Sequence, residues 1–397
     1  MTRAGAPATG LRAGTRWSLL LGNFAIGCGV MAVPGALNDL ARGLQVPVPA
    51  AGQLITAAAW AMALSAPLLA ALLSRLDRRH LLCGSLAWYA VGHALSAAMP
   101  DLAALLPVRA ATVLAAAVFT PAAAAVVGAL AEPHKRGEAI TFIFLGWSLA
   151  SVLGMPVAAL LAETSGWQGA FLAVAAVSAV AALAAWWNTP SALRPRATTV
   201  RDLAGVLARR DLMAVVAVTA LSATGQFVVF AYMAPYFAHV LRADAAEASL
   251  LFLWFGAFGV VGSVLMSRWI DRLGANAAAT LGLAAMSVSL LAWPWATGVA
   301  AMALVLVPWA LGCFSSNSAQ QARLAVAAPA LAAVLVSLNS SAIYLGQGIG
   351  AATGGLLLAG IGYGALAPVA AAAVMAATGL SWWLARGGSG ATALRNR

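Results

Sequence analysis

Residues 102–130 read LAALLPVRAATVLAAAVFTPAAAAVVGAL, a run in which Arg109 is the only charged residue. A helix needs about 20 mostly apolar residues to cross the hydrocarbon core of a bilayer. This run is longer than that, so we expect it to form a membrane-spanning helix. The rest of the chain can be divided by the same criterion.

The composition of the whole chain agrees with this expectation. Of the 397 residues, 63% are hydrophobic and 8% are charged, against about 25% charged in an average soluble domain. The mean hydropathy is +0.91, so lipid must be the solvent for much of the surface. A cytosolic enzyme and a nucleic-acid-binding factor are therefore excluded, despite a net charge of +11.

Division of the chain at its charged or Gly/Pro-rich breaks predicts an all-α integral membrane protein with twelve transmembrane helices. The predicted spans are 17–37, 51–73, 81–99, 102–130, 139–162, 169–188, 212–238, 248–267, 276–295, 299–320, 331–358 and 364–385. The first span has a longer apolar run than a signal peptide and no clear small-residue cleavage site, which predicts an uncleaved helix.

The basic residues predict the orientation of these spans. With the N-terminus in the cytoplasm, only Arg42 and Arg242 fall in loops on the opposite side, and Arg109 lies within a span. All the other Lys and Arg residues, Arg323 among them, then fall in cytoplasmic connections and termini. Cytoplasmic loops carry an excess of Lys and Arg, so both termini are predicted to be cytoplasmic. The basic excess thus reports topology, with contact to anionic lipid as a by-product.

The spans divide six and six about a hydrophilic break that contains Pro190 and Pro195. This predicts an N-terminal six-helix bundle over 1–188, a cytoplasmic central loop over 189–211 and a C-terminal six-helix bundle over 212–397. Features recur about 200 residues apart: Pro34 has a counterpart in Pro235, and the loop after the second span has one after the eighth. A duplicated six-helix unit is the architecture of many secondary transporters.

The chain resembles the major facilitator superfamily, and within it the drug:proton antiporter branch of sugar, chloramphenicol and purine nucleoside exporters. The resemblance runs from Gly22-Asn23-Phe24-Ala25-Ile26-Gly27 through Ala333-Val334-Leu335-Val336-Ser337-Leu338-Asn339 to the last span. It implies two pseudo-symmetric six-helix halves and secondary active transport by alternating access. It is specific for the fold and weak for the substrate.

Two charged loops match a motif of that family. The motif residues after the second and the eighth span are Arg75, Asp77, Arg78, Arg79, Asp271 and Arg272. A carboxylate beside guanidiniums can pair with neighbouring helix ends and hold one access state. Ser74 replaces the family's aspartate, which weakens the first copy of such a latch. The alternative is that these charges only anchor the topology.

Arg109 is the strongest single functional candidate. A guanidinium deep in a bilayer costs about 2.5–3.5 kcal/mol on insertion scales, so it should face the protein interior or a water-filled cavity. The resemblance implies a role in proton coupling or in binding an anionic substrate group. A side chain that extends to the nearby membrane surface is the alternative.

Small residues and a proline in the fifth span resemble the antiporter motif. Gly146, Gly154 and Pro156 predict a bent helix that approaches its neighbour closely and gates between the halves. Gly346 and Gly354 occupy matching places in the eleventh span. Ordinary packing seams are the alternative.

Polar residues inside spans are candidates for the transport pathway. They are Asn23, Gln226, Tyr232, Gln320, Gln321, Asn339 and Gln347. The first, fourth, seventh and tenth spans line the pathway in this superfamily, which favours Asn23, Arg109 and Gln226. Each of these side chains could instead bond a neighbouring helix.

The proton carrier is harder to assign. Relatives with the Ala25-Ile26-Gly27-Cys28-Gly29 pattern commonly continue with Glu, where this chain has Val30. Asp39 and His93 are then the remaining candidates, because arginine does not deprotonate in proteins. If neither serves, the chain is an uncoupled facilitator of a neutral metabolite such as a sugar or nucleoside.

The functional class predicted is a transporter. No HExxH or GxSxG pattern occurs and the four histidines are scattered, so we expect no enzyme activity, no cofactor and no metal. The expected partners are a small-molecule substrate, protons and the lipid bilayer, without nucleic acid. We expect a monomer in the inner (cytoplasmic) membrane that exports a small organic molecule or drug.

Overall fold

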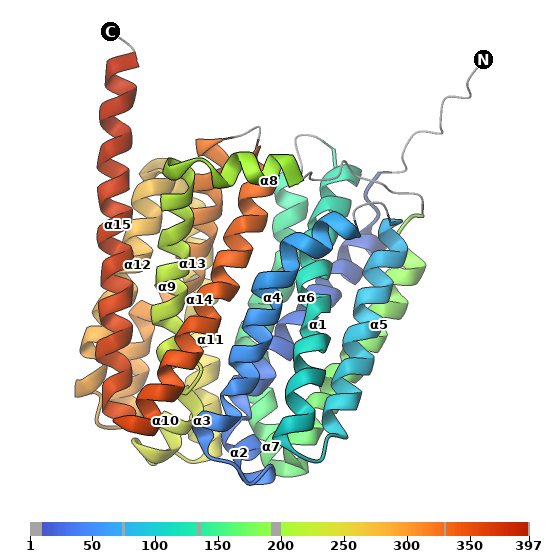
Figure 1. Ribbon diagram of the computed structural model, residues 1–397, viewed down its shortest axis with the longest axis vertical. Helices are drawn as coiled ribbons and strands as arrows, with labels where there is room; N and C mark the ends of the chain where they lie inside the picture. Colours follow the sequence, from blue (N-terminus) through green and yellow to red (C-terminus); the bar gives the residue numbers. More distant parts are fainter. Residues whose placement is uncertain (1–9, 74–75, 133–135, 192–199, 329–330, 396–397) are drawn as a thin grey trace.

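The computed structural model describes residues 10–73, 76–132, 136–191, 200–328 and 331–395, and the regular structure in these ranges is helical throughout (Figure 1). The first half contains α1 (Ala13–Gly35), α2 (Leu37–Gly43), α3 (Val48–Ala51), α4 (Gln53–Leu72), α5 (Arg78–Ala97), α6 (Leu102–Leu130) and α7 (Arg136–Asn188). The helix α8 (Val200–Leu207) follows. The second half contains α9 (Arg210–Phe230), α10 (Met233–His239), α11 (Ala245–Leu273), α12 (Ala275–Ala292), α13 (Val299–Ala327), α14 (Ala332–Gly360) and α15 (Leu366–Arg395), with 3-10 turns at Trp293–Trp295 and Tyr363–Ala365.

The long helices account for the twelve predicted spans. Ten stretches of the described residues are long and apolar enough to cross a membrane. One of them, Phe142–Asn188, holds two predicted spans that meet at Gly166, whose φ of 75° and ψ of 164° break the helix. The helix α5 is the remaining predicted span. It has a less apolar sequence and so falls outside the ten.

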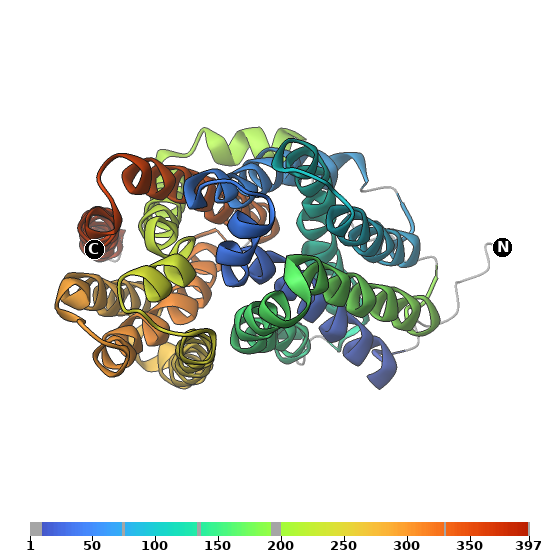
Figure 2. The ribbon, with the colours of Figure 1, turned by 90° about the horizontal axis from the view of Figure 1, so that it is seen from below.

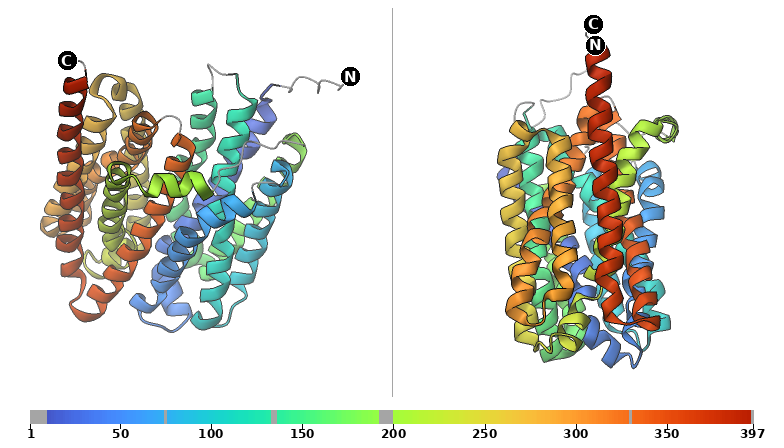
Figure 3. Two further views of the ribbon diagram at one scale, coloured as in Figure 1. Left: turned by 45° about the horizontal axis from the view of Figure 1, so that its top comes forward. Right: turned by 90° about the vertical axis from the view of Figure 1, so that its left-hand side faces the viewer.

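The spans of the first half and those of the second half form two groups, seen end-on in Figure 2. The groups meet where α4 packs against α14 and where α7 packs against α11. Figure 3 shows the same division from two other directions, with α15 extending beyond the ends of its neighbours. The fold is thus the predicted pair of six-helix halves, while the domain boundaries drawn from the sequence stay a prediction.

The two halves repeat a detail that the sequence does not reveal. The spans predicted at 17–37 and 212–238 are each broken, because α1 is followed by α2 and α9 by α10, both helices of seven residues. After them Gln45 and Arg242 both have a φ of 55°. A left-handed conformation at two equivalent non-glycine positions supports the duplication, since such a conformation is uncommon.

The ends of the molecule differ in how the halves pack. We call the end where α1 begins, α15 ends and α8 lies the termini end, and the end that carries α2, α3 and α10 the far end (Figure 1). At the far end one apolar cluster joins Leu37 and Leu40 of α2 to Met233 and Phe237 of α10. Near the termini end, the buried cluster around Leu212 is built by α8 and the second half, without residues of the first half. The halves are therefore packed together at the far end.

The outer surface is apolar, as contact with lipid requires. Leu64, Leu68 and Leu72 on α4 are 64%, 64% and 74% exposed. Such rows of large apolar side chains are unusual on a soluble protein and normal on a membrane protein.

One topological assignment is corrected by the structure. The sequence placed Arg323 in a cytoplasmic connection after a span ending at 320, but α13 continues to Ala327 and Arg323 is 6% exposed within it. Two polar side chains, Gln320 and Ser381, bond the guanidinium. These contacts favour helix over loop and are not visible in a hydropathy pattern.

Candidate functional site

Arg109 and His93, which the sequence nominated separately, are in direct contact. Arg109 lies about 10 Å along α6 from its start at the far end. Its Nη1 donates to Nε2 of His93 at 2.9 Å, and its Nη2 donates to the carbonyl of Gly29 at 2.6 Å. The residue exposure is 2% for Arg109 and 0% for His93. The guanidinium is thus turned into the protein, rather than towards the membrane surface.

The hydrogen bonds assign the protonation state of His93. Nδ1 lies 2.9 Å from the carbonyl oxygen of Tyr89, which can only accept, so Nδ1 carries a hydrogen. Nε2 then receives the bond from Arg109 through its lone pair. His93 is therefore neutral in this arrangement, because a second proton would remove the lone pair and place two cations side by side.

Aromatic rings close the site. The ring of Tyr89 lies 4.3 Å from that of His93, and its hydroxyl donates to the carbonyl of Ile26 at 3.1 Å. Phe171 of α7 lies 5.8 Å from both the His93 ring and the Arg109 Cζ atom. We call Gly29, Tyr89, His93, Arg109 and Phe171 the Arg109 nest, which joins α1, α5, α6 and α7.

The Arg109 nest holds a positive charge with no counter-ion among the described residues. Both hydrogen-bond partners of Arg109 are neutral, and its Nε is buried without a partner. Hydrogen bonds from a charged donor contribute about 1.5–3 kcal/mol each, which offsets the cost of burying the guanidinium. An arginine held this way is sensitive to any movement of its partners.

A second set of polar contacts lies in the equivalent places of both halves. In the first half, Asn23 accepts from Thr120 at 3.0 Å and donates to the carbonyl of Ile143 at 3.1 Å. In the second half, Thr219 donates to Asn339 at 2.6 Å and accepts from Gln320 at 3.2 Å. The predicted pathway residues Asn23 and Asn339 thus bond neighbouring helices in this conformation. Nδ2 of Asn339 has no hydrogen-bond partner within the described part of the chain.

Gln226 and Tyr232 lie where α9 meets other helices. Gln226 is 7% exposed and accepts from the thiol of Cys313 at 3.0 Å. Tyr232 donates to the carbonyl of Ala351 at 2.9 Å. A Cβ added at Gly52, on the first half, would overlap the Tyr232 hydroxyl. Tyr232 is therefore at the contact between halves.

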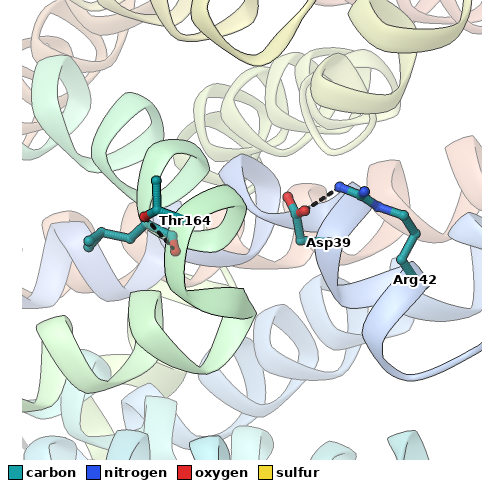
Figure 4. Close-up of polar contacts among 4 residues, drawn as sticks. Asp39, Arg42 and Thr164 are labelled. Atoms are coloured by element: carbon teal, nitrogen blue, oxygen red, sulfur yellow. Dashed lines mark hydrogen bonds and ion pairs between the residues drawn. The ribbon is translucent and has the colours of Figure 1, made fainter.

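Asp39 lies apart from the Arg109 nest. Its carboxylate pairs with Arg42, three residues on in α2 (Figure 4). Thr164 of α7, drawn beside it, bonds the carbonyl of Leu160 at 2.8 Å and makes no drawn contact with Asp39. The structure therefore separates the two proton-carrier candidates and gives only His93 a place beside Arg109.

The charged loop after α4 contacts helices of its own half. Asp77 accepts from the backbone N–H of Arg79 at 2.9 Å and caps α5, and the Arg79 guanidinium lies 4.3 Å from the ring of Trp186 at the end of α7. Arg78 is half-buried beside it. Arg75 and the side chain of Asp271 lie outside the described residues, and Arg272 is exposed.

The predicted gating glycines form packing seams inside each half. A Cβ at Gly146 would overlap the carbonyl of Leu20 in α1, and one at Gly154 would lie 3.1 Å from Met31 Cβ. Their counterparts Gly346 and Gly354 meet α9 in the same way. The expected close approach of helices is present, but it joins neighbours within a half.

One contact between the halves, that of α7 with α11, is made by a glycine that the sequence analysis did not select. A Cβ at Gly256 of α11 would lie 2.7 Å from the Ser151 carbonyl and would overlap Val152 of α7. Pro156 has no N–H for the carbonyl of Val152, four residues before it. The proline-weakened turn of α7 is thus the turn that faces α11.

Other residues of the site were also missed. Tyr89, Thr120, Phe171 and Thr219 look like ordinary helix residues in sequence, because each has a partner that is distant in the chain: Ile26, Asn23, Arg109 and Asn339 respectively. No group of three or more His, Cys, Asp or Glu side chains placed to hold a metal ion occurs among the described residues.

A bundle of two similar six-helix halves around buried polar contacts is the architecture of many membrane transporters. The chain belongs to the Major Facilitator Superfamily, whose family description matches residues 19–351.

Similar proteins include "Inner membrane transport protein YdhP" of Escherichia coli (strain K12), 30% identical over 348 residues that cover 87% of this chain and 89% of that protein. A "Probable sugar efflux transporter" of Mannheimia succiniciproducens is 29% identical and covers 89% of this chain and 88% of its own length.

Among solved structures, a D-xylose-proton symporter aligns with a TM-score of 0.76 at 18% identity, over 93% of this chain and 97% of that one. The human organic anion transporter MFSD10 (TETRAN) aligns with a TM-score of 0.72 at 17% identity, over 95% of this chain and all of that one. These likenesses show the fold. The chain is a multi-pass membrane transporter of the superfamily.

Proposed function

We propose that this transporter exports a small organic molecule in exchange for protons, and that the contact between His93 and Arg109 couples the two fluxes. The observation that carries the proposal is the 2.9 Å bond from Arg109 Nη1 to His93 Nε2 inside a closed site. A proton carrier must gain and lose its proton during the cycle, and histidine does so near physiological pH. Arginine beside it acts as a competitor for the same lone pair.

The packing of the far end supplies a way to link this contact to transport. Phe171 covers the Arg109 nest and also belongs to the apolar cluster that the two halves share at the far end. Separation of the halves there would leave Phe171 without its neighbours from the second half, so that its ring would turn away from the nest and admit water. Nε2 of His93 would then bind a proton in place of the hydrogen bond from Arg109. When the far end closes again, Arg109 would regain Nε2 and the proton would be released towards the termini end.

The gate at the centre of the molecule follows from the same packing. Gly256 of α11 lies against the turn of α7 that Pro156 weakens. A turn without its full hydrogen bonding bends at low cost, so rocking of the halves would pivot here. Gly146, Gly154, Gly346 and Gly354 would keep each half rigid as it moves.

The direction and the substrate class rest on relatives. Relatives named as sugar efflux transporters favour export and a sugar or similarly small polar molecule. We propose Asn23, Gln226, Tyr232 and Asn339 as residues of the transport pathway. Their amides and aromatic ring suit contact with such a molecule. We propose no enzymatic step.

The placement in the membrane follows from the arginines. We propose that the termini end is cytoplasmic, because loops at that end carry most of the basic residues. The chain would then lie in the inner membrane as a monomer, with Asp39 and Arg42 on the periplasmic side.

The test is transport into sealed vesicles that contain the purified protein. A panel of sugars, nucleosides, amino acids and amphipathic drugs is offered with and without an imposed pH gradient. We expect one class to accumulate against its own gradient when the pH gradient is present. Flux that reaches only equilibrium and ignores the pH gradient would overturn proton coupling and would favour a facilitator of a neutral metabolite.

A further inference from the structure

A large cavity lies at the termini end of the second half, away from the Arg109 nest. Its volume is about 1300 Å³ and its walls come from α9, α11, α12, α13 and α15. Leu212, Val326 and Leu384 give it apolar walls, and Trp382 and Trp383 lie at its rim. Trp383 is 65% exposed, and α12 and α15 stand at the outer edge of the bundle (Figure 2). The cavity therefore opens towards the bilayer.

Arg323 brings a positive charge into this cavity. The residue is 6% exposed and lines the wall. Its Nη1 donates to Oε1 of Gln320 at 3.4 Å and to Oγ of Ser381 at 3.1 Å, and both acceptors are neutral. No carboxylate among the described residues forms an ion pair with it. Nη2 and Nε make no hydrogen bond within the described structure, so two directions of the guanidinium fork are available to a ligand.

Among the described side chains of the wall, the one acidic group, Asp211, is already paired with an arginine. Asp211 accepts from Nε of Arg209 at 3.1 Å and from Nη2 at 2.5 Å. The first residues of α12, Ala275 to Ala277, also line the cavity, and their N-cap, Gly274, contributes no side-chain cap. The start of α9 and the ends of α11 and α13 line it too, so the helix dipoles largely offset one another and Arg323 supplies the charge.

We propose that this cavity binds the phosphate headgroup of an anionic phospholipid, with Arg323 as its main ligand. A buried guanidinium recognises phosphate through two parallel hydrogen bonds. Basic pockets between helices at the cytoplasmic side of membrane proteins bind such headgroups. The apolar walls and the two tryptophans at the rim fit acyl chains that enter from the bilayer, which a free phosphate would not need. Arg386, whose Cζ lies 3.6 Å from the ring of Trp382, adds a second cation at the rim.

The test measures lipid binding to the purified full chain by native mass spectrometry. Phosphatidylglycerol, phosphatidylcholine and glycerol phosphate serve as probes for anionic lipid, neutral lipid and free phosphate. We expect phosphatidylglycerol to bind about tenfold more tightly than phosphatidylcholine, and the substitution Arg323→Gln to weaken it about tenfold. Arg12→Gln is the matched control, because Arg12 is an exposed arginine at the same end of the other half.

A second variant keeps the test decisive even if Arg323→Gln does not fold. Ala277→Trp places a ring in the cavity from an exposed position and retains the arginine. It should reduce phosphatidylglycerol binding in the same way. Equal binding of the two lipids by the unmodified protein, or equal losses in Arg323→Gln and Arg12→Gln, would overturn the proposal. Displacement of the lipid by glycerol phosphate at similar concentrations would overturn it in favour of a free phosphate site.

Discussion

Arg109 and Arg323 are buried arginines of equivalent helices, the fourth spans of the two halves, yet their surroundings differ. Arg109 sits near the far end, in contact with a histidine, a backbone carbonyl and aromatic rings. Arg323 sits near the termini end and lines a cavity of about 1300 Å³. Neither has a carboxylate partner among the described residues. A buried arginine can therefore be accommodated in two ways. Neutral acceptors can surround it in a closed site, or it can face a cavity that has room for an external anion.

The difference separates a moving part from a fixed one. The partners of Arg109 come from three other helices of the first half, and one of them, Phe171, also packs in the cluster that both halves share, so we expect its contacts to respond when the halves separate. The partners of Arg323, Gln320 and Ser381, lie near the termini end, away from that cluster. Its site is expected to persist through the transport cycle.

The largest effect is expected from removal of the Arg109 charge. Arg109→Gln loses two hydrogen bonds of about 1.5–3 kcal/mol each, so gradient-driven transport should fall by about two orders of magnitude. Arg323→Gln should change transport by no more than about twofold. Both variants are assayed in vesicles at equal protein content. A similar loss in the two variants would remove the distinction between them.

A smaller effect should come from disturbing the Arg109 nest without changing any charge. A Cβ at Gly29 would overlap the Tyr89 hydroxyl and lie 2.8 Å from Nε2 of His93. Gly29→Ala should therefore lower stability by about 1–3 kcal/mol and reduce transport about tenfold.

The control is Gly84→Ala, in the exposed face of α5, where nothing lies within 4 Å of the added carbon. This change should be neutral or stabilise by about 0.5–1 kcal/mol. Thermal unfolding in detergent and transport in vesicles report the two effects. If Gly29→Ala transports as well as Gly84→Ala, the geometry of the Arg109 nest has no bearing on transport.

The smallest effect is expected at Asp39. Its partner Arg42 has a side chain that is 76% exposed, and exposed ion pairs contribute about 0–1 kcal/mol. Asp39→Asn should leave gradient-driven accumulation within about threefold of the unmodified protein. Complete loss of accumulation in this variant would transfer the coupling role from His93 to Asp39.

The sequence predicted the helical spans and the six-and-six division well, because hydropathy and loop charge report contact with lipid and water directly. It also selected Arg109 and His93, since ionisable residues in apolar spans are costly. The sequence did not predict that their side chains are in contact. The two residues are 16 positions apart on consecutive antiparallel helices, and only the packing of these helices brings the side chains together.

Two other features needed the structure for equally physical reasons. Arg323 looked like a loop charge because it follows Gln320 and Gln321 near the end of a span, where polarity alone does not separate a helix end from a connection. Gly256 looked like any small residue in an apolar helix. Its role depends on α7 of the other half, which no local pattern records.

Accumulation of substrate by His93→Gln in vesicles with an imposed pH gradient tests the central claim most directly. Gln keeps an acceptor for Arg109 but binds no proton. His239→Gln is the matched control, because His239 likewise bonds a carbonyl four residues earlier at 2.9 Å and makes no hydrogen bond to an arginine of the described structure. The coupling role predicts that His93→Gln loses accumulation and its pH dependence yet still exchanges substrate, while His239→Gln retains all three. Undiminished accumulation by His93→Gln would contradict it.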